Sequence, residues 1–124
     1  MSSNYRILVV EDDPDGQVVV ATMLERLNVP IDVASNVAEA EWCLFNSNQS
    51  YSAVIVDLAL PDKDGWELLS EIQAEPSTAS IPCIAVTAYH NSKLREQALT
   101  AGFTAYFPKP IEATSFARQL QAFV

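Results

Sequence analysis

Positive charge is scarce in this sequence: seven lysines and arginines stand against sixteen aspartates and glutamates, and the formal net charge is −9. Such a field would repel a phosphate backbone, so we do not expect direct binding to DNA or RNA. Long apolar runs are absent too, since none approaches the roughly 20 residues that a membrane-spanning helix needs. No basic and then apolar leader precedes the first apolar run. These absences predict a soluble, cytoplasmic protein.

Cysteine is also rare, with Cys43 and Cys83 as the only two. Neither lies in a CxxC pair or in the cysteine and histidine spacing of a zinc site. The sequence contains no GKS or GKT, which excludes a P-loop nucleotide site. We expect both cysteines to be buried free thiols in a reducing compartment.

What the sequence does contain is an alternation of short apolar runs with helical patterns. Three of the runs are almost continuously hydrophobic, which is typical of parallel strands covered on both faces. The alternation predicts an α/β fold, a doubly wound (βα)5 three-layer sandwich whose parallel strands have the flavodoxin-like order 2-1-3-4-5. The runs are Arg6–Val10, Ile31–Ala34, Ala53–Val56, Cys83–Val86 and Ala105–Phe107.

Local signals mark where the helices begin and end. Pro14 after Asp13 is typical of a first helical residue. Asn36 with Glu39 three residues later resembles a capping box, and Gly102 is in place to end the fourth helix. We expect a single domain over 1–124, either complete in itself or excised from a larger protein, with no room for an output domain.

Polar side chains follow the predicted strands at their carboxyl ends. Glu11 and Asp12 follow the first strand and Asp57 the third, while Thr87 and Lys109 follow the fourth and fifth. In a sheet of this order, ligands bind at the carboxyl ends of the strands. The site lies at the topological switch point between strands one and three. We therefore expect these side chains to meet in one pocket.

The acids in this set need a counter-charge. Two like charges about 4 Å apart repel by about 4 kcal/mol at an effective dielectric of about 20. A divalent cation and Lys109 would offset that repulsion, and clustered carboxylate oxygens suit Mg²⁺. Asp57 can then act as a nucleophile on phosphorus. Lys109 and Thr87 would contact oxygens of the transferred phosphoryl group.

The stretches ILVVEDDP, VIVDLALPDKDGWELL, IPCIAVTAY and AYFPKPI together resemble the receiver domains of two-component response regulators, over essentially the whole chain from Arg6. The resemblance implies that Asp57 is the phosphoacceptor. It implies that Asp12 and Asp57 ligate Mg²⁺ directly, that Glu11 acts through water, and that the backbone carbonyl of Ala59 completes the set. The phosphoryl donor would be a histidine kinase or a histidine phosphotransfer domain.

The resemblance also implies a switch. Lys109 would pair with the phosphoryl group, and Thr87 would move toward that group while Tyr106 turns inward behind it. The face made by the fourth helix, fifth strand and fifth helix would then change its preference for an unknown output protein. The Lys109–Pro110 bond is expected to be cis. The resemblance thus implies a monomer or weak dimer that is a phosphorylated switch and not an enzyme.

Each signal also has an ordinary structural interpretation. Asp57 could simply open a turn, Lys109 could be a surface lysine, and Tyr106 could be a core aromatic residue. We expect Trp42 and Trp66 to be packing residues.

Rival functions fit less well. An aspartyl phosphohydrolase of the haloacid dehalogenase kind needs a second acid where this chain has Ala59. A flavin mononucleotide carrier needs a phosphate-binding loop after the first strand, where Glu11, Asp12 and Asp13 would repel the phosphate. A pseudo-receiver that serves only for protein contacts would not keep every chemical position filled.

Overall fold

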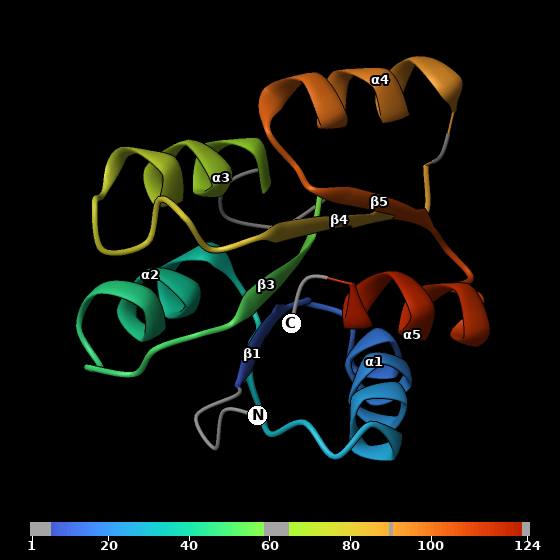
Figure 1. Cartoon of the computed structure of the whole chain (residues 1–124), viewed down its shortest axis with the longest axis horizontal. Coiled ribbons are helices and arrows are strands. Elements are labelled where there is room, and N and C mark those ends of the chain that lie inside the picture. The colour runs from blue at the N-terminus through green and yellow to red at the C-terminus, as the bar shows by residue number, and fades with distance from the viewer. Residues whose placement is uncertain (1–5, 59–64, 90, 123–124) are drawn as a thin grey trace.

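The computed structural model describes residues 6–58, 65–89 and 91–122. Within these ranges five strands alternate with five helices along the chain (Figure 1). The strands form one parallel sheet in the order β2-β1-β3-β4-β5, as predicted. The elements are β1 (Ile7–Val10), α1 (Pro14–Arg26), β2 (Ile31–Ala34), α2 (Val37–Phe45), β3 (Ala53–Asp57), α3 (Gly65–Ala74), β4 (Cys83–Thr87), α4 (Ser92–Ala101), β5 (Ala105–Pro108) and α5 (Ala113–Gln121).

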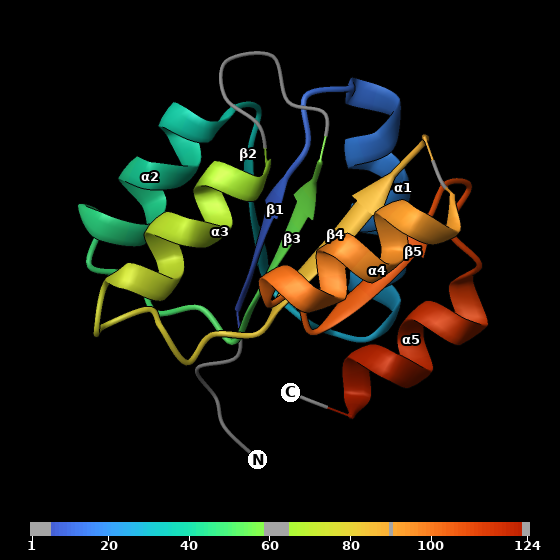
Figure 2. The same cartoon turned by 90° about the horizontal axis from the view of Figure 1, so that it is seen from above.

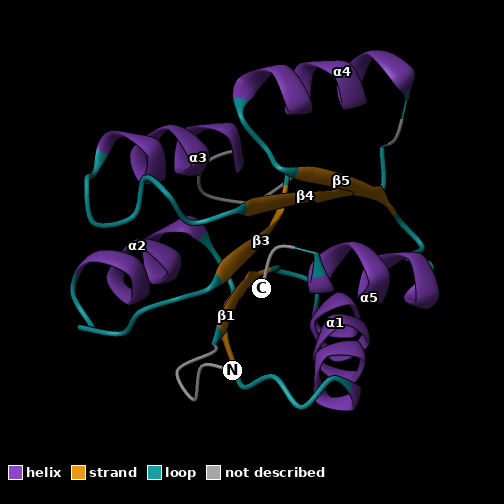
Figure 3. Ribbon diagram, viewed as in Figure 1, coloured by secondary structure: helices purple, strands orange, loops and turns teal. Residues whose placement is uncertain are grey.

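Helices cover both faces of the sheet. Figures 2 and 3 show α1 and α5 together on one face, and α2, α3 and α4 on the other. Successive residues of a strand point to opposite faces, so Leu8 and Val10 lie in the core under α2, α3 and α4. Ile7 and Val9 lie in the core under α1 and α5. This two-sided burial explains why the central strands are almost continuously apolar.

The helix caps follow the sequence signals, with one difference. Asp13 and Asn36 are the N-caps of α1 and α2, and Gly102 ends α4 at a φ of 123°, which glycine adopts without strain. The Asn36 side chain accepts a hydrogen bond from the Glu39 backbone N–H at 2.8 Å. The Glu39 carboxylate accepts from the backbone N–H of Ser35, not from that of Asn36. The return bond of the expected capping box is therefore displaced by one residue.

Two expectations about packing are only half right. Cys83 is buried, but Cys43 is of intermediate exposure, although both are free thiols. Trp66 packs against the core under α2, α3 and α4, whereas Trp42 on α2 is 59% exposed. None of the described helices has the length and apolar character that spanning a membrane would require.

Candidate functional site

The carboxyl edge of the sheet brings together residues from four strands. Glu11 follows β1, while Asp57 ends β3 and Thr87 ends β4, and all three are buried with exposed fractions of 3%, 7% and 1%. Lys109 follows β5, and its backbone N–H donates to the Thr87 carbonyl at 2.8 Å. Parallel strands in the observed order therefore bring polar residues that are far apart in the sequence to one edge of the sheet.

Lys109 joins two carboxylates at this edge. Its Nζ lies 2.5 Å from Glu11 Oε1 and 3.0 Å from Asp57 Oδ2, across 98 and 52 residues of sequence. Burial lowers the pKa of Lys109, but the hydrogen bonds that its ammonium donates to Glu11 and Asp57 outweigh burial and hold that pKa above its usual range. The ammonium is therefore charged at neutral pH and neutralises part of the acidic cluster.

Glu11 is held in place from several directions. Its Oε2 accepts from the Asp13 backbone N–H at 3.2 Å, and its backbone N–H donates to the Ala34 carbonyl on β2 at 2.9 Å. A β-carbon on Gly16 would lie only 2.7 Å from Glu11 Oε1, so the glycine makes room for the carboxylate. Burial raises the pKa of Glu11, opposed by the hydrogen bond from Lys109.

Three carboxylates at this edge form a candidate cation site. Glu11, Asp12 and Asp57 each offer one oxygen, and these oxygens lie within 4.8 Å of one another. Asp12 is exposed, whereas the other two are buried, so the cluster faces solvent on one side. The set consists only of hard oxygen donors and carries more negative charge than Lys109 balances, which suits Mg²⁺. The expected carbonyl ligand, that of Ala59, lies outside the described residues.

The two residues expected to form a switch occupy neighbouring strands. The Thr87 hydroxyl accepts from the Tyr89 backbone N–H at 3.1 Å. Tyr106, in β5, is 7% exposed and belongs to the core that includes Ala98 of α4. Burial raises the pKa of Tyr106. The Lys109–Pro110 peptide bond is cis.

Some features of the site escaped the sequence analysis. The sequence predicted that Lys109 would offset the repulsion among the acids, but not that its Nζ would bond Glu11 and Asp57 at the same time. The sequence also did not predict that a glycine is required at position 16. The spacing between Glu11 and Gly16 does not indicate that the first turn of α1 and the Glu11 carboxylate lie in contact. Hydrophobic periodicity predicts which face of a helix or strand a residue occupies, but it does not predict the distance between two side chains.

Comparison with known proteins assigns the chain to a family. The family model for the response regulator receiver domain matches residues 7–121. An uncharacterized 14.6 kDa protein of Leptolyngbya boryana is 35% identical over 117 residues, covering 94% of this chain and 88% of that protein. Response regulator protein PilR of Pseudomonas aeruginosa is 32% identical over 111 residues, covering 89% of this chain but only 24% of PilR. The chain thus spans about a quarter of that relative's length.

A solved structure shares the fold of this chain. The receiver domain of a sensor histidine kinase from Pseudomonas aeruginosa PAO1 has 33% sequence identity, a TM-score of 0.84 and 95% coverage of each chain. That domain was crystallised with a magnesium ion coordinated in its active-site cleft. With a family match over nearly its whole length and the carboxyl-edge site in place, this chain belongs to the response regulator receiver domains, the switch modules of two-component signalling.

Proposed function

We propose that this chain is a phosphoacceptor module that takes a phosphoryl group from a partner phosphohistidine onto Asp57 in a Mg²⁺-dependent reaction. The observation that carries the proposal is the Lys109 bridge between Asp57 and Glu11 at the carboxyl edge of the sheet. We further propose that residues 1–124 form one receiver unit, and that the donor is a histidine kinase or a histidine phosphotransfer domain.

Phosphoryl transfer mainly requires that the reacting groups are positioned and that the negative charge of the phosphoryl oxygens is neutralised. An oxygen of Asp57 attacks phosphorus; a P–O bond forms as the P–N bond to the histidine breaks, and the imidazole leaves with the electron pair of that bond. The raised pKa of Lys109 keeps its ammonium protonated, so it can pair with the negatively charged phosphoryl oxygens. Mg²⁺ held by Glu11, Asp12 and Asp57 would supply the remaining neutralisation of those oxygens.

The proposed switch starts at Thr87. Its hydroxyl, now held by the Tyr89 backbone N–H, would donate to a phosphoryl oxygen. Movement of Thr87 changes the space beside Tyr106 on the neighbouring strand, since Ala85 of β4 pairs with Tyr106 of β5. The face formed by α4, β5 and α5 would change its surface as a result and recognise an output partner.

Phosphate uptake by Asp57→Asn tests the assignment. The wild-type protein, incubated with acetyl phosphate and Mg²⁺, should gain one acid-stable, base-labile phosphate per chain by mass spectrometry. Asp57→Asn should gain none, because an amide is not a nucleophile at phosphorus. Asp15→Asn, an exposed acid at the start of α1 that lies outside the cluster, is the matched control and should behave as wild type. Uptake of one phosphate by Asp57→Asn would overturn the assignment.

A further inference from the structure

An apolar stripe on α2 faces solvent. Ala38, Trp42 and Phe45 follow one another at helical spacings of four and three residues, and so lie on one side of the helix. Trp42 is 59% exposed and Phe45 37%. Single exposed apolar residues are ordinary, but a tryptophan beside a phenylalanine on one face is typical of an interaction site.

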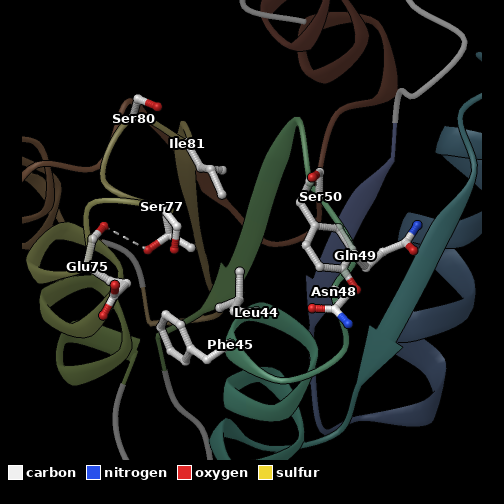
Figure 4. Close-up of a pocket in the computed structure, with 11 residues that line it drawn as sticks. Leu44, Phe45, Asn48, Gln49, Ser50, Glu75, Ser77, Ser80 and Ile81 are labelled. Carbon is white, nitrogen blue, oxygen red and sulfur yellow. Dashed lines mark hydrogen bonds between the residues drawn. The ribbon is translucent and has the colours of Figure 1, made fainter.

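The stripe continues into a hollow at the amino edge of the sheet. The hollow measures about 600 Å³ and is lined by Leu44 and Phe45 at the end of α2, Tyr51 before β3, and Ile81 before β4. Figure 4 shows Leu44 and Phe45 on one side of this space, and Glu75 and Ser77 across from them. Most of the other lining residues carry hydroxyl, amide or carboxylate groups, so the apolar side chains lie inside a polar rim, as they do in many protein-binding sites.

Two acids lie beside this surface, Glu39 on α2 and Glu75 in the lining of the hollow. Residues 27–92 contain nine aspartates and glutamates but a single lysine, Lys63, and no arginine. Glu39 lies one helical turn before Trp42, and Glu75 lines the hollow. By contrast, residues 93–124 contain four lysines and arginines against two glutamates. Within residues 27–58, which contain α2, the chain has four acids and no lysine or arginine.

We propose that the stripe and the hollow, together the α2 surface, bind a basic amphipathic segment of a partner protein. Apolar side chains of that segment would cover Trp42 and Phe45 and enter the hollow, and its lysines or arginines would face Glu39 and Glu75. Charge complementarity selects this occupant, because a second copy of the chain packed symmetrically on the same surface would bring like charges together.

The α2 surface is remote from the phosphoacceptor site. Tyr51 precedes β3 at the amino edge and Asp57 ends β3 at the carboxyl edge. At about 3.3 Å per residue the two lie about 20 Å apart. A partner on the α2 surface would leave Asp57 open to its phosphoryl donor, and this binding does not depend on the function proposed above.

A designed peptide tests the α2 surface. The probe is a fluorescein-labelled helix with leucines on one face and lysines on the other, and its control has the same lysines with serine in place of leucine. Fluorescence anisotropy should show binding of the leucine peptide that weakens at least about tenfold in Trp42→Ala, as expected for an aromatic anchor. Glu75→Gln should weaken it a few-fold. Val18→Ala, an equally exposed apolar site on α1, and Asp57→Asn should leave it unchanged.

Three results would overturn the proposal. Equal binding of the serine peptide would show attraction by charge alone. Unchanged binding by Trp42→Ala, with circular dichroism equal to wild type, would place the peptide elsewhere. A dimer in analytical ultracentrifugation that Trp42→Ala dissociates would show that a second copy is the occupant.

Discussion

Replacement of Lys109 by methionine probes the charge balance of the site most directly. The ammonium lies 2.5 Å from Glu11 Oε1 and 3.0 Å from Asp57 Oδ2, and the two carboxylate side chains are only 4% and 8% exposed. At about 3 Å and an effective dielectric of about 20, each attraction amounts to roughly 5 kcal/mol before the cost of desolvation. Without the ammonium, the carboxylate oxygens of Glu11 and Asp57 would repel each other. At 4.8 Å, the upper bound on the separation of the nearest oxygens, this repulsion is roughly 3 kcal/mol.

We expect Lys109→Met to lower the free energy of unfolding by about 3 kcal/mol near neutral pH, at the low end of what removal of one partner from a buried pair costs. A domain with about 5–15 kcal/mol of stability still folds after such a loss. Burial already raises the pKa of Glu11, and loss of Lys109 removes the bond that opposes this. A carboxyl with a raised folded pKa weakens the fold above that pKa, so the deficit should shrink as the pH falls below neutral.

Urea unfolding followed by circular dichroism measures the effect. Lys93→Met, at an exposed position of α4, is the matched control and should change stability by less than about 0.5 kcal/mol. Adding Asp57→Asn to Lys109→Met should recover much of the loss, because one of the repelling charges is gone. Equal stability of Lys109→Met and wild type would refute this reasoning, and so would a deficit that does not change with pH.

Three further predictions concern other groups. Gly16→Ala should lower the thermal midpoint, because its methyl group would meet the Glu11 carboxylate at 2.7 Å and this clash should outweigh alanine's better helix propensity; a midpoint above wild type would contradict the packing. The hydrogen bond from Arg6 lowers the pKa of Asp32. Asp32→Asn should therefore cost about 1 kcal/mol in urea above about pH 4, and the cost should disappear as acid protonates the wild-type carboxylate; persistence in strong acid would exclude the ion pair as its source. Burial raises the pKa of Cys83 to about 12, so this thiol should react with a maleimide only as the protein unfolds, and rapid labelling of the folded chain would show otherwise.

The sequence determined the order of elements and the edge at which the chemistry gathers. Apolar runs and turn signals specify buried strands, and Ile31–Ala34 is observed with the predicted bounds. The third and fourth strands each extend one residue further than predicted, to Asp57 and Thr87. A prediction from apolar residues stops at the first polar side chain. The observed strands run one residue further because backbone hydrogen bonding between strands does not depend on side-chain polarity.

Only the tertiary structure decided which groups touch. Trp42 and Trp66 both occur in helices and were both expected to pack, yet Trp42 is 59% exposed because its side of α2 faces away from the sheet. Lys109 is 98 residues from Glu11 in sequence, and its bridge depends on how β5 and β1 are placed across the intervening strands. Local pattern sets secondary structure through short-range periodicity, but burial and charge pairing depend on distances between remote segments, which exist only after the sheet has assembled.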